Sequence, residues 1–269
     1  MTDILPPIRL GSSHPENNDM FVHAFARGLH VIRSFGEQTE KQTLSDVARR
    51  SNISRASARR LLHTLVHLGY VDSDGKHFWL KPKILDLGYS YISSKALAGV
   101  SQDAMNELAM RQNSSASMVV LDGKEIVYVV RSTIRNGSPC TASIGGRRPA
   151  YIMAVGRILL AELSDTELDD YLETTTFTRY TPYTVTDKKM LREIIRSDGK
   201  KGVSIVRREM NEGVCAIAMP VRDKDGEVIA ALGLSIRPDL SMDRTAVQSA
   251  RRELSETVDT INELIRMRG

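Results

Sequence analysis

The chain has 269 residues, of which 41% are hydrophobic and 26% charged, an ordinary composition for a globular protein with one large core or two smaller ones. It shows neither a secretory signal nor an apolar stretch near the ~20 residues that span a bilayer, which argues against a secreted or membrane protein. Two cysteines, Cys140 and Cys215, are too few for a disulfide scaffold, so we expect a reduced, cytoplasmic protein.

The net charge of +4 is distributed unevenly along the chain. Residues 21–83 carry eleven Lys and Arg against five Asp and Glu, or +6, whereas residues 1–20 sum to −2 and residues 84–269 to zero. This division is typical of a module that binds a polyanion, joined to a domain with a different task. Residues 1–20, polar and without periodicity, are interpreted as a flexible tail.

A domain over residues 21–82 follows the tail, and its predicted elements stand in a familiar order. Apolar spacing, capping residues and turn signals predict a helix over 24–35, a short helix beginning at Thr43, a turn at 52–53, a helix over 54–68 and a β-hairpin over 70–80. This is the order of a winged helix-turn-helix, a motif that places its last helix in the major groove of DNA.

The predicted helix over 54–68 has two chemically different faces. One is an apolar stripe formed by Ala58, Leu61, Leu62, Leu65 and Leu68. The other is basic, as a recognition helix requires, because its donors must reach bases and phosphates while the apolar stripe anchors it. We therefore predict a double-stranded DNA partner and assign its contacts to Ser54, Arg55, Ser57, Arg59, Arg60, His63 and, at the tip of the wing, Lys76. The alternative for these side chains is a solvated basic surface without a ligand.

Neither a metal site nor an active site is expected. His63 and His67 lie one helical turn apart, but no third ligand or intervening glutamate accompanies them, so we expect no metal and no cofactor. Residues 97–269 contain no phosphate-binding loop, dinucleotide glycine pattern or nucleophile elbow. All six histidines precede residue 78, which leaves this region without histidine for acid–base catalysis, so no catalytic residue is assigned.

Beyond Pro82 the pattern changes to a linker helix over 83–96 and then to a second domain over 97–269. In that domain we predict helices over 97–112, 150–163, 164–173, 187–198 and 242–267, and strands over 116–121, 125–131, 139–144, 203–208, 215–221 and 228–236. Strands and helices follow each other without the rhythm of a parallel sheet, so the expected fold class is α+β with an antiparallel sheet.

Long segments of the chain resemble the IclR family of bacterial transcription regulators. They are FARGLHVIRSFG (25–36), TLSDVARRSNISRASARRLLHTLVHLGYV (43–71), LKPKILDLGYSYISS (80–94), SIGGRRPAYIMAVGRILLAEL (143–163) and GVCAIAMPVRDKDGEVIAALGLSI (213–236). The resemblance covers nearly the whole chain and implies an N-terminal winged helix-turn-helix, a linker helix and a C-terminal GAF-like effector domain. It also implies homodimers, or tetramers built as dimers of dimers, that bind operator DNA and respond to a small carboxylic acid.

Two segments are most similar to one subgroup, which controls protocatechuate, 4-hydroxybenzoate and β-ketoadipate catabolism. They are LDLGYSYISS (85–94) in the linker and MVVLDGKEIVYVVR (118–131) in the second domain. The subgroup implies an aromatic or dicarboxylic acid as effector. A regulator of another small-acid or sugar-acid operon is the alternative.

The chain departs from the family members that bind small keto acids. Those members place polar side chains where this chain has Ala216 and Gly233, and only Ser235 is kept. The chain also has Val206 four residues after Gly202, where the family pattern usually has Asp or Ser. Loss of these polar groups argues against an effector the size of glyoxylate or pyruvate. We therefore expect a larger, flatter or more apolar effector.

The effector is expected between the sheet and the helix that begins at Ala150. The N-terminal amides of a helix bind carboxylates. The predicted effector-binding residues are Ala154 and Val155 through their backbone amides, and Arg147, Arg148 and Ser235 through their side chains. The alternative for the two arginines is a contact with a partner subunit.

Two functions of other classes compete with a regulator. An enzyme with an accessory DNA-binding module would need clustered catalytic groups over 97–269, and the sequence has none. An architectural nucleoid protein would spread its positive charge widely and would not need a neutral second domain. Both are disfavoured. The sequence does not distinguish a repressor from an activator.

Overall fold

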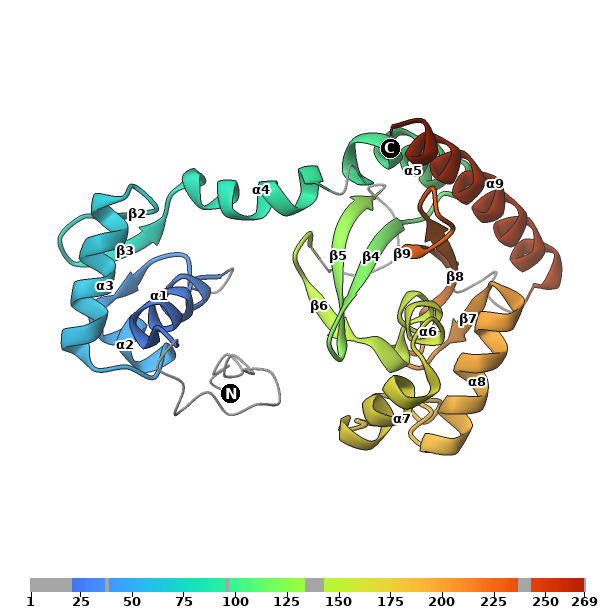
Figure 1. Ribbon diagram of the computed structural model, residues 1–269, viewed down its shortest axis with the longest axis horizontal. Coiled ribbons are helices and arrows are strands. Elements are labelled where there is room, and N and C mark those ends of the chain that lie inside the picture. The colour runs from blue at the N-terminus through green and yellow to red at the C-terminus, as the bar shows by residue number, and fades with distance from the viewer. Residues whose placement is uncertain (1–20, 37–38, 95–96, 134–142, 237–242, 269) are drawn as a thin grey trace. The chain divides into compact units, whose positions relative to one another are not determined.

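The computed structural model describes residues 21–36, 39–94, 97–133, 143–236 and 243–268 (Figure 1). The chain divides into two compact units, Met1–Tyr91 (unit 1) and Ile92–Gly269 (unit 2). The predicted functional boundaries after residues 82 and 96 are not tested by this division and stay predictions. None of the described helices is both long and apolar enough to cross a membrane.

Unit 1 has the elements of a winged helix-turn-helix. Its helices are α1 (His23–Arg33), α2 (Leu44–Arg50) and α3 (Arg55–His67), and its antiparallel strands, in the order β1-β3-β2, are β1 (Gln42–Thr43), β3 (His77–Leu80) and β2 (Val71–Ser73). Thr43 and Asp46 form a capping box at the start of α2, and Ser54 Oγ accepts the N–H of Ser57 at 3.1 Å at the start of α3. The predicted caps therefore begin both helices of the motif.

The helices of unit 1 pack around a small apolar core. Its buried residues are Val31, Val47, Ala48, Ala58, Leu62, Leu65 and Val71. The apolar stripe predicted on α3 is correct except at its end, where Leu68 is 50% exposed. The helix ends at His67, and Gly69 turns the chain away with a φ of +79°, so Leu68 lies beyond the turn that faces the core.

The linker starts with a 3-10 turn, η2 (Pro82–Ile84), and continues as helix α4 (Leu85–Ser94). Lys83 Nζ donates a hydrogen bond to the carbonyl oxygen of Leu68 at 3.0 Å and lies 5.0 Å from the ring centroid of Tyr70. These contacts fix the start of the linker to the end of α3.

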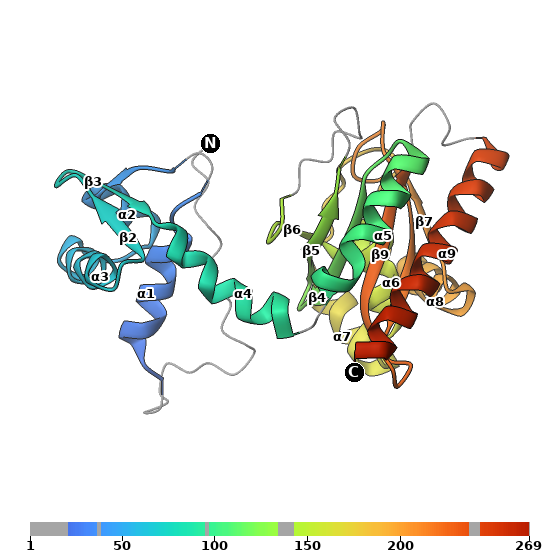
Figure 2. The same cartoon turned by 90° about the horizontal axis from the view of Figure 1, so that it is seen from above.

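In unit 2 the described strands form one six-stranded antiparallel sheet in the order β6-β5-β4-β9-β8-β7. The strands are β4 (Ala116–Asp122), β5 (Glu125–Ser132), β6 (Arg147–Pro149), β7 (Ser204–Arg207), β8 (Cys215–Arg222) and β9 (Val228–Ile236). Helices α5 (Leu97–Gln112) and α9 (Arg244–Arg268) cover one face, whereas η3 (Ala150–Ile152), α6 (Ala154–Ala161), α7 (Asp165–Thr174) and α8 (Lys188–Lys201) lie on the other (Figure 2). The predicted α+β class with an antiparallel sheet is confirmed.

Two apolar cores sandwich the sheet because side chains alternate along each strand. Met118 and Leu232 pack beneath α5 and α9, while their neighbours Val119 and Ala231 pack beneath α6. Strands buried on both faces need apolar residues at almost every position, which accounts for the composition of β9.

The strand predicted over 139–144 lies mostly outside the described residues. Residues 139–142 lie outside the described part of the chain, and Ser143 and Ile144 belong to no strand. The strand in this region is β6, which follows a turn at Gly145–Gly146 and pairs with β5. A three-residue edge strand has too little alternation to be recognised in a sequence.

The helix predicted over 150–163 is divided in the structure. The turn η3 comes first, Met153 is extended with φ −109° and ψ 134°, and α6 begins only at Ala154. A Cβ on Gly156 would lie 2.1 Å from the carbonyl oxygen of Ala150, so the first turn of α6 packs directly on η3. This close approach of the two backbones requires glycine.

Candidate functional site

The outer side of α3 carries the residues that were assigned to DNA. Ala58, Leu62 and Leu65 face the core. The exposed residues are Ser54, Arg55, Arg59, Arg60 and His63, with Ser57 half-buried. Arg55, Arg59 and His63 follow one another at four-residue spacing and therefore lie along one side of the helix. We call Ser54, Arg55, Ser57, Arg59, Arg60 and His63 the basic face of α3.

Within the described part of the chain, the arginines of the basic face take part in no ion pair. Arg49 on α2 differs, since its guanidinium lies 2.6 Å from the Asp46 carboxylate. A guanidinium presents five donors in a planar fork that matches phosphate oxygens and the O6 and N7 atoms of guanine. The basic face of α3 is therefore equipped to bind an anionic groove.

Lys76 lies at the exposed tip of the wing, in a turn that Asp74 organises. The Asp74 carboxylate accepts the backbone N–H of Lys76 at 2.9 Å and that of His77 at 2.7 Å. Hydrogen bonds from the backbone of His77 and Lys76 lower the pKa of Asp74 to about 2. The turn thus holds Lys76 at the end of a defined hairpin, where it is free to approach a polyanion.

The described residues include no group of three or more His, Cys, Asp or Glu that could hold a metal ion. His63 and His67 are both exposed. In unit 2, burial raises the pKa of the Cys215 thiol, which keeps its sulfur protonated and unreactive at neutral pH. Cys140 lies outside the described residues.

The predicted effector-binding residues of α6 and β9 lie together in unit 2. A Cβ on Gly233 would come within 2.5 Å of Val155 Cγ1, so the first turn of α6 sits directly above Gly233. Ala154 and Val155 are buried in that turn, where backbone N–H groups lack partners within the helix. Ser235, two residues further along β9, faces the same side of the sheet and is half-buried.

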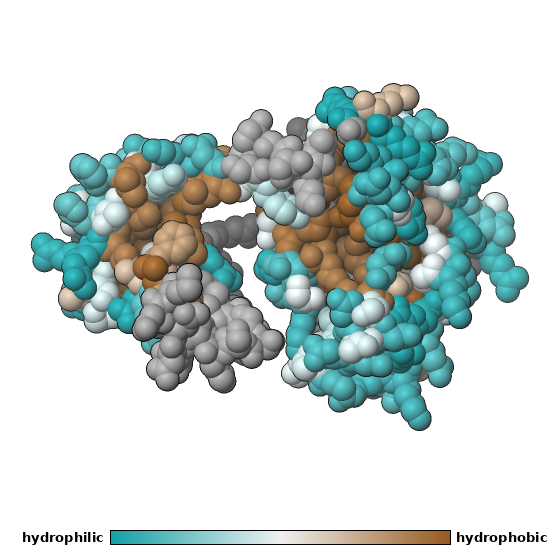
Figure 3. Space-filling model, in the orientation of Figure 1, coloured by the Kyte–Doolittle hydropathy of each residue, from teal (hydrophilic) through white to brown (hydrophobic). Residues whose placement is uncertain are grey.

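The strand register adds two neighbours to this surface. Ser117 on β4 pairs with Gly233, and Ala216 on β8 pairs with Ser235. We call these four residues, with Val155 above them, the α6 pocket wall. Apolar residues gather in this part of unit 2, where Figure 1 places β4, β5 and α6 (Figure 3). The arrangement combines a mostly apolar floor with two hydroxyl groups and the start of a helix.

Arg147 and Arg148 lie elsewhere, on β6 beside the β4–β5 hairpin. Arg147 Nε donates to Glu125 Oε2 at 2.8 Å, and its guanidinium also pairs with the Asp122 carboxylate. Arg148 donates to the carbonyl oxygen of Arg147 at 2.8 Å. The structure therefore separates the two predicted arginines from the α6 pocket wall, towards the opposite end of β5.

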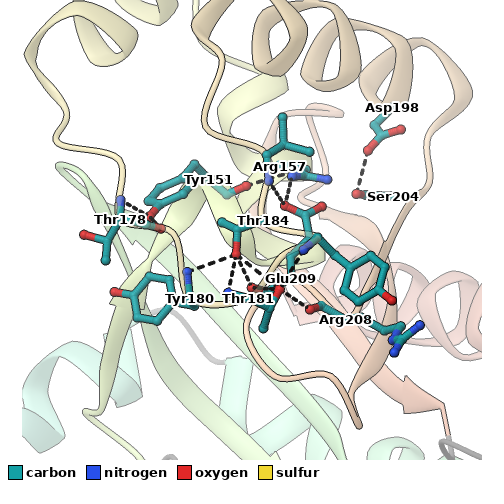
Figure 4. A network of polar contacts seen from close by, with 12 residues as sticks. Tyr151, Arg157, Thr178, Tyr180, Thr181, Thr184, Asp198, Ser204, Arg208 and Glu209 are labelled. Carbon is teal, nitrogen blue, oxygen red and sulfur yellow. Dashed lines mark hydrogen bonds and ion pairs between the residues drawn. The ribbon is translucent and has the colours of Figure 1, made fainter.

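A buried ion pair stands behind the first turn of α6 (Figure 4). The Arg157 and Glu209 side chains are only 3% and 7% exposed, and Arg157 Nη2 lies 2.8 Å from Glu209 Oε2. Arg157 Nε also donates to the carbonyl oxygen of Tyr151 at 2.9 Å. One guanidinium thus joins α6 to η3 and to the β7–β8 connection.

Glu209 extends this network to the loop between α7 and α8. Its Oε2 accepts the N–H of Val185 at 3.1 Å, and its carbonyl oxygen accepts the Thr184 hydroxyl at 2.7 Å. Nearby, Asp198 accepts a hydrogen bond from Ser204 Oγ at 2.6 Å, and burial raises the pKa of this carboxyl group. The loop between α7 and α8, which has no regular structure, is thereby fixed to the β7–β8 connection.

The sequence analysis did not identify the Arg157–Glu209 pair. One signal was available, since Arg157 is the only charged residue of α6, AVGRILLA. A charge inside an otherwise apolar helix needs a buried partner. The partner lies 52 residues away in the chain, however, so its identity depends on the fold.

Two domain families match successive regions of the chain. Residues 24–75 match the IclR helix-turn-helix domain, and residues 89–263 match the bacterial transcriptional regulator IclR C-terminal domain. Each matched region contains one of the two candidate surfaces, the basic face of α3 and the α6 pocket wall.

Three similar proteins extend these matches. The chain is 39% identical to the Pca regulon regulatory protein of Pseudomonas putida, over 80% of this chain and 74% of the relative. It is 31% identical to the p-hydroxybenzoate hydroxylase transcriptional activator of Acinetobacter baylyi, over 94% and 96% of the two chains. The crystal structure of a transcriptional regulator from Rhodococcus sp. RHA1 superposes with a TM-score of 0.81 at 38% identity, covering 91% of this chain and 98% of that one.

Proposed function

This chain belongs to the IclR family of bacterial transcription regulators, and we propose that it controls genes of aromatic-acid catabolism through operator binding that a small carboxylic acid modulates. The observation that carries DNA binding is the basic face of α3, on which exposed arginines stand opposite a buried apolar stripe. Support for the metabolic role comes from the names of the two relatives, which concern the Pca regulon and p-hydroxybenzoate hydroxylase.

In the proposed complex α3 lies in the major groove. Arg55, Arg59 and Arg60 contact base edges or phosphates, and Ser54, Ser57 and His63 support them with further hydrogen bonds. Lys76 reaches the DNA backbone or the minor groove from the tip of the wing. A bidentate contact between arginine and guanine discriminates against other bases by about 1–3 kcal/mol.

The operator is expected to be a palindrome read by a homodimer, in which two copies of α3 enter grooves about 34–36 Å apart. Exposed apolar residues on unit 1 support a second copy of the chain. Phe25 and Leu29 on α1 are 68% and 38% exposed, and Leu85 and Leu87 at the start of α4 are 71% and 53% exposed. Exposed apolar side chains mark a protein interface where they form a contiguous patch. A tetramer formed by two such dimers would need a further contact surface.

The effector is proposed to bind at the α6 pocket wall. Its carboxylate would accept hydrogen bonds from the amides of Ala154 and Val155, and Ser235 would contact a polar substituent. The small side chain of Ala216 would leave space for a flat ring beside Val155. Binding would favour one arrangement of the two DNA-binding units over another and so change operator affinity.

Fluorescence anisotropy with promoter DNA from upstream of the chain's own gene tests this function. We expect tight, sequence-preferring binding at moderate salt, and a change in affinity when one acid from a panel of hydroxybenzoates, protocatechuate and dicarboxylates is added. A rise in the melting temperature of the protein with the same acid would show that the acid binds the protein directly. Equal affinity for promoter and unrelated DNA, or no response to any acid, would contradict the proposal.

A further inference from the structure

Arg131 lies near the end of β5, on the side of the sheet that α6 covers. It pairs with Ser117 on β4, and Ser117 in turn pairs with Gly233 on β9. Two residues further along these strands, Val119 and Ala231 belong to the apolar core beneath α6. Because alternate residues share a face, Arg131 projects from the same face as the α6 pocket wall.

We propose that Arg131 provides the positive charge that binds the carboxylate of the effector. This inference rests on the proposed function, because it assumes that an organic acid binds in unit 2. It replaces the role that the sequence analysis gave to Arg147 and Arg148, and it names an anchor that acts together with the amides at the start of α6.

The distances within the sheet suit this role. Neighbouring strands lie about 4.8 Å apart, so the backbone of Arg131 is roughly 10 Å from that of Gly233, two strands away. An arginine side chain and a benzoate-sized molecule together span this separation. The carboxylate would lie between the start of α6 and Arg131, and the ring would extend beside Val155 towards Ala216 and Ser235.

Burial strengthens the interaction that Arg131 offers. Its side chain is half-buried, and its Nε atom is removed from solvent. An ion pair in such a position is screened less by water than one at the surface. The guanidinium fork also binds a carboxylate through two parallel hydrogen bonds, which distinguishes a carboxylate from an amide of the same shape.

The other arginines near this face are placed for different tasks. Arg147 and Arg148 lie at the level of Val127 and Ile126, four and five residues from Arg131 along β5 and so about 13–17 Å away. Arg157 is turned towards Glu209 and the carbonyl oxygen of Tyr151, behind α6 rather than over the sheet (Figure 4). Arg131, by contrast, lies on the same face and at the same end of the sheet as Ser117 and Ser235.

A charge-deletion experiment tests the proposal with two probes that differ in charge but hardly in shape. Isothermal titration would compare 4-hydroxybenzoate with 4-hydroxybenzamide, and protocatechuate with its amide, for the wild type, Arg131→Gln and Arg147→Gln. We expect the wild type to prefer one acid over its amide at least tenfold, Arg131→Gln to lose this preference to within about twofold, and Arg147→Gln to keep it.

Each outcome decides the matter. If Arg131→Gln keeps the wild-type ratio of acid to amide affinity, Arg131 is not the anchor, although the proposed function stands. If the wild type binds neither acid, the assignment of an aromatic effector and this inference fall together. Should Arg131→Gln not fold, as judged by its melting curve, Arg131→Lys takes its place. It should lose several-fold in acid affinity alone, and equal losses for acid and amide would overturn the proposal.

Discussion

The basic face of α3 and the ion pair behind α6 use arginine in opposite ways. On the basic face of α3, Arg55, Arg59 and Arg60 are exposed and outside any ion pair among the described residues. Behind α6, Arg157 is buried and bound to Glu209. An exposed arginine keeps its donors for a ligand, whereas a buried and paired one holds secondary structure in place. The exposure of an arginine and its ion-pair partners thus indicate whether it can bind a ligand or stabilises the fold.

The largest effect is expected from breaking the buried pair. Glu209→Ala leaves the Arg157 guanidinium buried without its partner, which should destabilise unit 2 by about 3–5 kcal/mol. Urea unfolding followed by far-UV circular dichroism measures this loss. The fluorescence of Trp79, the only tryptophan, follows the unfolding of unit 1 separately.

Arg192→Ala is the matched control for the buried pair. Arg192 pairs with Asp165 and Asp169 at 2.9 and 2.7 Å, but at a solvent-exposed site, so its loss should cost less than about 1 kcal/mol. Similar losses for Glu209→Ala and Arg192→Ala would show that the Arg157–Glu209 pair has no special structural role.

A somewhat smaller effect is expected on the basic face of α3. Arg59→Ala should weaken operator binding by about 1–3 kcal/mol, or roughly 5- to 150-fold, and reduce its salt dependence. Fluorescence anisotropy over a range of KCl concentrations measures both quantities. Arg252→Ala on α9, an exposed arginine of unit 2, serves as the control and should leave both unchanged.

The helix caps should contribute about equally in the two units. Thr43 caps α2 with Asp46, and Ser164 caps α7 with Glu167, in the same type of capping box. Thr43→Ala and Ser164→Ala should each cost about 1 kcal/mol. Thr43→Ala should shift the Trp79 fluorescence transition, and Ser164→Ala the circular dichroism transition of unit 2. The reverse assignment would contradict the assumption that the caps act locally.

The smallest effect is expected in the stability of the wing hairpin at acid pH. Asp74 has a pKa of about 2 in the folded protein, below its ordinary value of 3.8. A lowered folded pKa means that the carboxylate stabilises the hairpin above about pH 4 and that this contribution is lost as the pH falls towards 2. Asp74→Asn should remove this pH dependence from the Trp79 signal. An unchanged acid profile would assign the loss to another group.

Elements that depend on local signals were predictable. Ser54 begins α3 and Gly69 follows its end, as expected, and α5 spans the predicted residues 97–112. Caps, turns and helical periodicity act over a few residues, so they can be recognised in the sequence. The same holds for the exposed arginines of α3, because an amphipathic helix shows its two faces directly.

Features that depend on distant segments were not predictable. The break before α6 follows from the contact of Gly156 with Ala150, and β6 has only three residues. Arg147 was predicted to bind the effector because the sequence did not reveal its ion pairs with Asp122 and Glu125. Strand register determines which charges meet, and register follows from the folded sheet rather than from spacing.

The central claim is that α3 reads a specific operator from a symmetric assembly. Hydroxyl-radical footprinting of the promoter upstream of the chain's own gene tests it most directly. We predict two protected segments whose centres lie one helical turn, or about 10–10.5 base pairs, apart or at a multiple of this distance, and both should weaken in Arg59→Ala. Uniform protection without preferred positions, or a footprint unchanged by Arg59→Ala, would contradict it.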